Sequence, residues 1–276
     1  MPNPDELDQE RLRSRLVDAG PYAALDVVGL TGSTNGDLIA AAARGAADRT
    51  VLAAEEQAAG RGRLQRSWHS PRGQGLAVSV LLRPLVPNAA LSWVPLLTGI
   101  AVVRAVDRTA GVPACLKWPN DLLLGEQRSK AAGILAELVT GRDGMAIVVG
   151  IGVNVHHRRE DLPSGSGGLP RTSLAAEGAQ VDRAEFAEHL LTSLAELDDL
   201  WRAHGGDVVA SGLADSYRQR CGTLGEQVRV DLGTERFEGT AEDIDDRGRL
   251  VVRSADGAAR EISAGDVVHV RGSTAR

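Results

Sequence analysis

The chain has 276 residues, of which 43% are hydrophobic and 25% charged, and it carries a formal net charge of −6 at pH 7. These proportions exclude a disordered, collagen-like or coiled-coil chain, and the negative charge argues against general nucleic-acid binding, which usually needs a basic face. The length predicts a main domain of roughly 150 to 200 residues and a smaller second one.

The cysteine content and the N-terminal sequence indicate that the protein is cytoplasmic. Cys115 and Cys221 are the two cysteines, and they lie too far apart for metal-ligand spacing or a disulfide framework. Residues 1–18 are acidic and mixed and lack the apolar core of a signal peptide, and no stretch reaches the roughly 18 apolar residues of a membrane span. We therefore expect a cytoplasmic protein that does not enter a membrane.

The first third of the chain predicts strands alternating with helices. Apolar runs predict buried strands over residues 25–30, 50–54 and 76–82. An alanine-rich helix is expected over about 37–47. A long apolar segment over 91–110 predicts a buried helix despite Pro95 and Gly99.

The middle of the chain predicts the centre of a mixed sheet. Strand-like segments cover residues 115–118, 121–124, 132–139 and 145–155. Residues 163–170, rich in Gly, Ser and Pro, predict a flexible surface loop. Asp182 and Glu185 are spaced as a capping box, and apolar residues at helical spacing up to Trp201 predict a helix that covers one sheet face.

From about Gly222 the sequence changes to short strands. They are predicted over 228–232, 236–242, 250–253 and 267–270, with a turn at residues 246–248. Such a series is typical of a small β-barrel of about 50 residues. We therefore expect an α+β fold, with a short N-terminal segment over 1–24, a main domain with a mixed β-sheet covered by helices over 25–220, and a small β-barrel over 222–272.

The segment GRGRLQRSW over residues 60–68 is rich in arginine and glycine and lies in a long predicted loop. Glycines let backbone N–H groups approach a ligand, and guanidinium groups match the oxygens of phosphate and carboxylate. It is no Walker loop, which needs a Gly-Lys pair, and a dinucleotide fingerprint needs glycine where Gln65 stands. Taken alone, the segment fits an anion site and a solvated surface loop equally well.

Lysine is rare in this chain. Among 31 basic residues only Lys117 and Lys130 are lysine, within the segments KWPND and KAAGILAE. A compact ammonium and a planar guanidinium are not interchangeable, so this placement indicates a site that needs a point charge. The alternative is that Lys130 caps a strand edge.

For several polar residues a purely structural role is as compatible with the sequence as a functional one. The triplet Ser33-Thr34-Asn35 is typical of a helix N-cap, and Gln57 of a surface amide. The glycines of GIGVN, over 150–154, can simply allow close packing. Asp121 is a candidate magnesium ligand or a partner that orients Lys130, but an aspartate after Pro-Asn is also a common turn residue.

Other catalytic arrangements are disfavoured. His156 and His157 are adjacent and point in different directions in regular backbone, and the sequence contains no HExxH, CxxC or GxSxG motif. Metal-dependent and serine-dependent hydrolysis are therefore not expected.

In their order along the chain, these motifs resemble those of a biotin protein ligase. The motifs are Ser33-Thr34-Asn35, Gln57, GRGRLQRSW from Gly60, KWPND from Lys117, KAAGILAE from Lys130 and GIGVN from Gly150. The resemblance spans about residues 26–270. One departure is Gln65, where the family loop GRGRxGRxW commonly has glycine, so the dynamics of this loop can differ.

The resemblance implies an ATP-dependent enzyme with a biotin/lipoate ligase-like catalytic domain and an SH3-like C-terminal domain. It implies that biotin and ATP, with Mg²⁺, form biotinyl-5'-adenylate and release pyrophosphate. The biotinyl group then passes to a lysine of a biotin carboxyl carrier domain of an acyl-CoA carboxylase. The SH3-like domain would contact the nucleotide and dock the acceptor.

The resemblance also assigns residues. It implies that biotin is bound by Ser33, Thr34, Asn35, Gln57, Arg61, Gly62, Arg63, Lys130 and Gly133. It implies that the nucleotide is bound by Arg61, Arg63, Arg66, Trp68, Lys117, Asn120 and Asn154. The catalytic residues would be Lys130, Arg63 and Asp121, with Asp121 as the candidate metal ligand.

Two other functions stay open from sequence. A lipoate or octanoate protein ligase shares the catalytic fold, but the GRGR loop and KWPND favour biotin. A non-catalytic nucleic-acid-binding protein could use the arginine loop and the barrel, against which the net charge of −6 argues. Some family members carry an N-terminal helix-turn-helix domain, and about 30 residues before Ser33 are too few for one, so we expect no sequence-specific DNA binding. The oligomeric state is left open.

Overall fold

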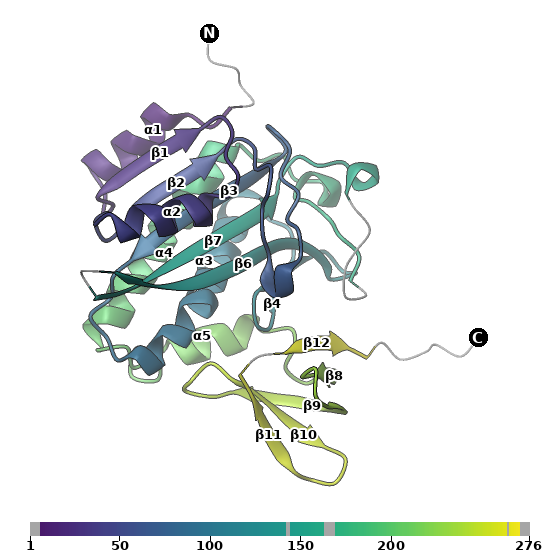
Figure 1. Cartoon of the computed structure of the whole chain (residues 1–276). Helices are drawn as coiled ribbons and strands as arrows, with labels where there is room; N and C mark the ends of the chain where they lie inside the picture. The colour runs from purple at the N-terminus through teal and green to yellow at the C-terminus, as the bar shows by residue number, and fades with distance from the viewer. Residues whose placement is uncertain (1–5, 142–143, 163–168, 264, 271–276) are drawn as a thin grey trace.

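The structure, a computed structural model, describes residues 6–141, 144–162, 169–263 and 265–270 (Figure 1). Its larger sheet has the strand order β1-β2-β3-β7-β6-β5-β4. The strands are β1 (Ala24–Val28), β2 (Thr50–Ala54), β3 (Gly75–Leu82), β4 (Ala114–Lys117), β5 (Asp121–Leu124), β6 (Ser129–Gly141) and β7 (Gly144–Asn154). Among the described ladders of this sheet only that of β1 and β2 is parallel, so the expected mixed sheet is confirmed.

Helices cover both faces of this sheet (Figure 1). The helix α2 (Thr34–Ala43) packs on one face, where Leu38 meets Leu81 and Val148. The helices α3 (Val94–Thr109) and α4 (Arg183–Ala203) pack on each other and on the opposite face. Because neighbouring residues of a strand point to opposite faces, burial on both sides requires the continuous apolar run of β3, in which all eight residues are buried.

The helix α3 begins where proline is tolerated. Pro95 lies in the first turn, whose N–H groups have no partner within a helix, and a 3₁₀ turn over Asn88–Trp93 precedes it. The segment Asn88–Thr109 is long and apolar enough to cross a membrane, but 72% of its most apolar window is buried inside the protein. It is the central core helix of the fold.

Two helices begin where a side chain caps the backbone N–H groups of the first turn. The helix α2 begins at Thr34, earlier than the predicted start at residue 37, because Ser33 is its N-cap and Ser33 Oγ accepts from Gly36 N at 3.4 Å. Asp182 caps α4 in the expected way, with Oδ1 accepting from Glu185 N at 2.7 Å. Most of the predicted loop over 163–170 lies outside the described residues.

Three elements were not predicted. The helix α1 (Gln9–Arg13) continues into a π-helical turn over Ser14–Asp18, and Leu12 and Leu16 bury their side chains in the main core. The others are α5 (Leu213–Arg220) and β11 (Ala259–Ile262). All three are short and mostly polar, so their hydrophobic periodicity is weak.

The C-terminal part is an antiparallel sheet in the order β11-β10-β9-β8-β12. Its other strands are β8 (Gln227–Asp231), β9 (Arg236–Ile244), β10 (Leu250–Ser254) and β12 (Asp266–His269). Within the described ranges no ladder joins β11 to β12, and the five antiparallel strands are consistent with the small β-barrel expected from the sequence. Two buried indoles attach it to the main part: Trp93 Nε1 donates to Asp246 O at 2.7 Å, and Trp118 Nε1 to Gly248 O at 2.9 Å.

A buried ion pair joins the start of α4 to the end of β2. Arg183 Nη2 lies 2.6 Å from Glu55 Oε2, and Arg183 Nη1 donates to Gly75 O at 2.9 Å. Both side chains are almost fully buried. Removing one partner of such a pair leaves an uncompensated buried charge.

We therefore predict that Arg183→Met lowers the free energy of unfolding by about 3–5 kcal/mol, measured by denaturant titration. The double variant Glu55→Gln/Arg183→Met should recover much of this loss, because it removes both charges. A single variant as stable as the unaltered protein would contradict this role of the pair.

Candidate active site

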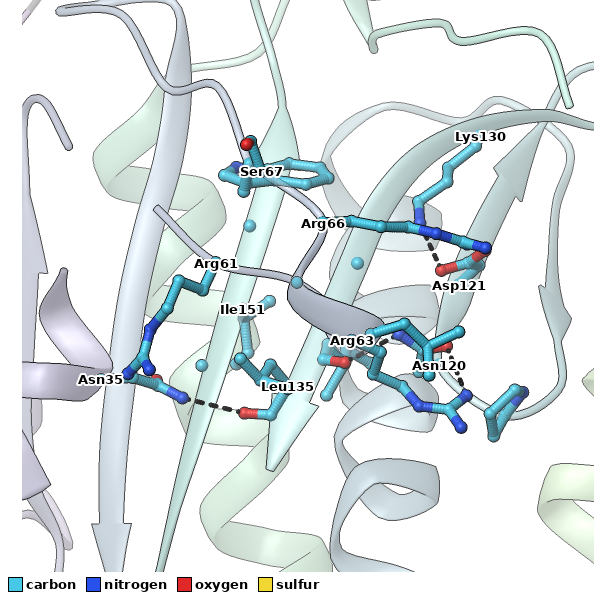
Figure 2. Close-up of a pocket in the computed structure, with 18 of the residues that line it drawn as sticks. Asn35, Arg61, Arg63, Arg66, Ser67, Asn120, Asp121, Lys130, Leu135 and Ile151 are labelled. Carbon is cyan, nitrogen blue, oxygen red and sulfur yellow. Dashed lines mark hydrogen bonds and ion pairs between the residues drawn. The ribbon is translucent and has the colours of Figure 1, made fainter. Parts of the chain in front are cut away.

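A pocket opens on the face of the larger sheet that carries α2, beneath the loop over residues 60–68 (Figure 2). Its walls come from the first turn of α2, this loop, β5, β6 and β7. Residues 169 and 171, together with Gly265 just before β12 and Val267 within β12, complete it. Segments far apart in the sequence thus meet at one cavity.

A polar network forms one end of the pocket. Thr34 donates from both N and Oγ1 to Gln57 Oε1, at 2.9 and 3.1 Å. Ser79 Oγ, fully buried on β3, lies 2.7 Å from both Thr34 Oγ1 and Asn35 Oδ1. The predicted residues Ser33, Thr34, Asn35 and Gln57 therefore line a single wall, which Ser79 supports from behind.

Glu137 links this wall to the arginine loop. Asn35 Nδ2 donates to Leu135 O at 3.1 Å (Figure 2), and it also donates to Glu137 Oε2 at 2.8 Å. The other carboxylate oxygen of Glu137 lies 3.5 Å from Arg61 Nη2. Glu137 was not singled out from sequence, although it ends the KAAGILAE motif, and its contacts orient both Asn35 and Arg61.

Two glycines of β7 form the floor of the pocket. Gly150 and Gly152 point to the same face because alternate residues of a strand share a face. A Cβ at Gly150 would lie 2.2 Å from Asn35 Oδ1, and one at Gly152 would lie 2.4 Å from Trp68 Cε2. These glycines therefore permit close packing by two predicted site residues.

The loop over 60–68 folds back on itself. Trp68 N donates to Gly60 O at 2.8 Å, and Gly62 N donates to Arg66 O at 2.7 Å. Between them the chain makes a 3₁₀ turn over Arg63–Gln65. The reversal occurs at Leu64, whose φ of 55° is uncommon for a residue with a side chain. The indole of Trp68 packs on Gly152 and so holds the loop against β7.

The loop directs its arginines to different parts of the pocket. Arg63 Nη1 donates to Asn120 Oδ1 at 3.4 Å, and Asn120 Nδ2 donates to Ile134 O at 2.9 Å. Figure 2 shows the Arg66 side chain extending toward Lys130 and Asp121. Since Arg61 contacts Glu137, the three guanidinium groups are spread along the pocket.

Lys130 and Asp121 form an ion pair at the other end. Lys130 Nζ lies 2.6 Å from Asp121 Oδ1 (Figure 2). Asp121 pairs with Gly133 across the ladder, but Leu123 pairs with Lys130, so Ala131 is an extra residue in β6. Without this bulge, strict alternation from Gly133 would turn Lys130 away from the pocket. The bulge places its ammonium on the same face as the Asp121 carboxylate.

Lys117 connects the pocket to the C-terminal sheet. Its Nζ donates to Val267 O at 2.6 Å, and its side chain is buried. The next residue, Trp118, donates from N to Thr223 Oγ1 at 3.0 Å. The KWPND motif thus holds the two sheets together while Lys117, Asn120 and Asp121 line the pocket.

The predicted site residue Asn154 and the adjacent histidines His156 and His157 lie outside the pocket. Asn154 does not line this pocket: its buried Nδ2 donates to Thr172 O at 2.9 Å. His157 is buried, and burial lowers its pKa to about 4.

In the part of the chain that the structure describes, no three His, Cys, Asp or Glu side chains gather as metal ligands. Arg171 does line the pocket, although no sequence motif indicated it.

Charge is unevenly distributed in the pocket. Among the described residues its one lining carboxylate is Asp121, and its lining cations are Arg61, Arg63, Arg66, Lys117, Lys130 and Arg171. The neutral polar groups gather around Asn35 and Gln57. The pocket therefore suits a ligand with a neutral hydrogen-bonding end and a strongly anionic end.

Comparison with known proteins gives consistent matches. Residues 41–154 match the family described as "Biotin/lipoate A/B protein ligase family", and residues 223–270 match "Biotin protein ligase C terminal domain". The biotin--[acetyl-CoA-carboxylase] ligase of Mycobacterium tuberculosis is 41% identical over 96% of this chain and 96% of its own. The bifunctional ligase/repressor BirA of Bacillus subtilis is 33% identical over 87% of this chain and 71% of its own.

A solved structure agrees with these matches. The biotin protein ligase from Aquifex aeolicus in complex with biotin and ATP superposes with a TM-score of 0.75 at 28% identity. The alignment covers 91% of this chain and all of that one. The expected catalytic fold is therefore confirmed, together with the C-terminal sheet domain.

The floor of the pocket yields a prediction about the loop. Because a Cβ at Gly152 would overlap the Trp68 indole, Gly152→Ala should displace Trp68 and raise the population of the open loop. Trypsin should then cleave after Arg61, Arg63 or Arg66 faster than in the unaltered protein, as mass spectrometry can follow.

Gly32→Ala is the matched control, since a Cβ at Gly32 meets nothing within 4 Å and this residue lies just before the pocket wall. Its cleavage rate should equal that of the unaltered protein. Equal rates for both variants, with equal melting temperatures, would show that Trp68 does not hold the loop.

Proposed function

The chain belongs to the biotin protein ligase family, and on that premise we propose that it joins biotin to ATP as biotinyl-5'-adenylate and transfers the biotinyl group to a lysine of a biotin carboxyl carrier domain. The observation that carries this proposal is the pocket itself. It combines a neutral polar wall with a cationic end in one cavity. Biotin has a polar ureido ring and a carboxylate tail, and the adenylate adds a phosphate.

We propose that the ureido group lies against the first turn of α2, where Ser33, Thr34 and Asn35 meet Gln57. Gln57 Oε1 accepts from Thr34, so its Nε2 group can donate to the ureido carbonyl. Unpaired polar edges in a closed pocket are costly, so this wall would select a ligand with matching hydrogen bonds. Arg61, Gly62 and Gly133 would flank the bound biotin.

We propose that Lys130 attracts the biotin carboxylate and then stabilises charge on the α-phosphate. A carboxylate oxygen attacks the α-phosphorus, the bond to the bridging oxygen breaks, and pyrophosphate leaves with the electron pair. Lys130 would act through its positive charge and form no covalent bond. Its contact with Asp121 at 2.6 Å supports a positioning role for that carboxylate.

The nucleotide would lie along the cationic side. Arg63, Arg66 and Lys117 would contact its phosphate oxygens, Asn120 would contact the adenylate, and Trp68 would close the loop over it. Asn154 would contribute to the nucleotide site indirectly, by holding the backbone of Thr172 in place. In the second reaction the amine of the carrier lysine attacks the acyl carbon, AMP leaves, and the amine loses a proton.

Magnesium would enter with ATP. Mg²⁺ is commonly held by one or two carboxylates together with substrate phosphates and water. Asp121 fits as one such ligand, since it is the lining carboxylate among the described residues, but its Oδ1 already contacts Lys130. This single carboxylate therefore suits a magnesium ion that is held mainly by the phosphates of ATP.

Three broader assignments are also proposals. The catalytic domain would span 25–220 and the SH3-like domain 222–272, since β1 to β7 form one sheet and β8 to β12 form the other. A cytoplasmic location is supported by the burial of α3 in the core. The net charge of −6 supports the absence of sequence-specific DNA binding.

The function can be tested with purified carrier domain, ATP and biotin. We expect mass spectrometry to find one biotinylated lysine on the carrier. Lys130→Ala should lower the rate of biotin-dependent adenylation by two or more decades, since one such donor contributes about 3–4 kcal/mol. Arg158→Ala, at an exposed arginine outside the pocket, should leave the rate unchanged. Near-normal adenylation in Lys130→Ala would reject the assignment of this residue.

Ligand specificity can be tested by thermal unfolding. A ligand that binds only the folded protein raises the melting temperature by mass action, so biotin should raise it and lipoate should not. A comparable rise with lipoate would favour a lipoate ligase instead.

A further inference from the structure

Arg171 faces the pocket beside Lys130. The two residues form a parallel β-bridge, with Lys130 N donating to Pro170 O at 2.8 Å and Thr172 N donating to Lys130 O at 2.9 Å. Residues that face each other across a β-ladder present their side chains to the same side. Both side chains accordingly line the pocket.

The backbone that carries Arg171 is firmly anchored. Thr172 and Ser173 have no exposed surface. Asn154 Nδ2 holds Thr172 O at 2.9 Å, and Ser173 Oγ donates to His157 O at 2.6 Å. A guanidinium on such a rigid segment is ready to bind a ligand at little further cost in conformational entropy.

No direct ion pair with a described residue neutralises the guanidinium of Arg171. Other arginines at half-buried positions are paired, as Arg49 is with Asp198 at 2.7 Å and Arg202 with Asp48 at 2.5 Å. Arg171 makes no hydrogen bond or ion pair among the described residues, and the nearby Asp121 carboxylate is already in contact with Lys130. Burial lowers the pKa of Arg171, which is the signature of a cation that has lost water without gaining a direct partner.

Arg171 lies at the end of the pocket remote from the polar wall. Asn35 donates to Leu135 O, and Lys130 is five positions away along β6. At about 3.3 Å per residue the two points are roughly 15 Å apart. A ligand whose neutral end meets Asn35 would thus present its far, anionic end to Arg171.

We propose that Arg171 binds the β- and γ-phosphates of ATP and stabilises the pyrophosphate that leaves during adenylation. This inference rests on the proposed function and adds to it a residue outside the motifs of the resemblance. As the bond between the α-phosphorus and the bridging oxygen breaks, the electron pair moves onto that oxygen and negative charge grows on the leaving group. A planar guanidinium matches two of its oxygens at once.

The two partial reactions separate this role from others. Only adenylation involves a triphosphate or pyrophosphate, whereas transfer starts from biotinyl-5'-adenylate and releases AMP. Arg171→Ala should therefore raise the KM for ATP and for pyrophosphate by about tenfold or more in biotin-dependent pyrophosphate–ATP exchange. The rate of transfer from purified biotinyl-5'-adenylate to a carrier domain should stay within about twofold.

Arg158→Ala is the matched control, because it removes an exposed arginine from the same region of the chain. It should change neither reaction. Arg171→Gln keeps a polar but shorter and uncharged side chain, and it provides the same test if Arg171→Ala fails to fold. Thermal unfolding checks both variants.

Two results would overturn the proposal. Unchanged KM values for ATP and pyrophosphate in a folded Arg171 variant would show that the residue does not contact the triphosphate. A loss confined to transfer would show that Arg171 contacts the carrier domain instead. If the unaltered protein, correctly folded, catalyses no exchange at all, the proposed function falls as well, an outcome distinct from a defect of the variants.

Discussion

The contact between Lys130 Nζ and Asp121 Oδ1, at 2.6 Å, is the interaction on which the chemistry of the pocket depends. It exists because one extra residue in β6, Ala131, reverses the alternation of the strand. Lys130 then shares a face with Asp121, and the bridge between Lys130 and Arg171 brings a second cation to the same place. A local irregularity in the ladder thus concentrates positive charge where phosphate chemistry needs it.

The rest of the pocket is built around this cationic end by close packing. Gly150 and Gly152 leave room on β7 for Asn35 and Trp68, so the polar wall and the arginine loop both rest on the sheet. Glu137 ties Asn35 to Arg61, and Lys117 ties the pocket to β12 of the second sheet. The site therefore consists of two ends held at a fixed separation, and an elongated ligand with one anionic end matches that separation.

Much of this could be predicted from sequence. Continuous apolar runs located β2, β3 and β7 within one or two residues, because strands buried on both faces have a strong signal. The ordered motifs indicated most pocket residues. The bulge at Ala131 could not be predicted, because it depends on pairing with β5, nor could the role of Gly152, which depends on Trp68 84 positions away in the chain. Arg171 carries no motif, and only the bridge to Lys130 reveals it.

The reaction on which all the others depend is the formation of an acyl-adenylate from biotin in this pocket. The most direct measurement incubates the protein with biotin and ATP labelled at the α-phosphate, without any acceptor, and identifies the bound product by rapid quenching and chromatography. We expect about one equivalent of labelled biotinyl-5'-adenylate per protein, and its formation should depend on biotin. Folded protein that yields no labelled adenylate, or that yields an equal amount of lipoyl-adenylate when lipoate replaces biotin, would contradict it.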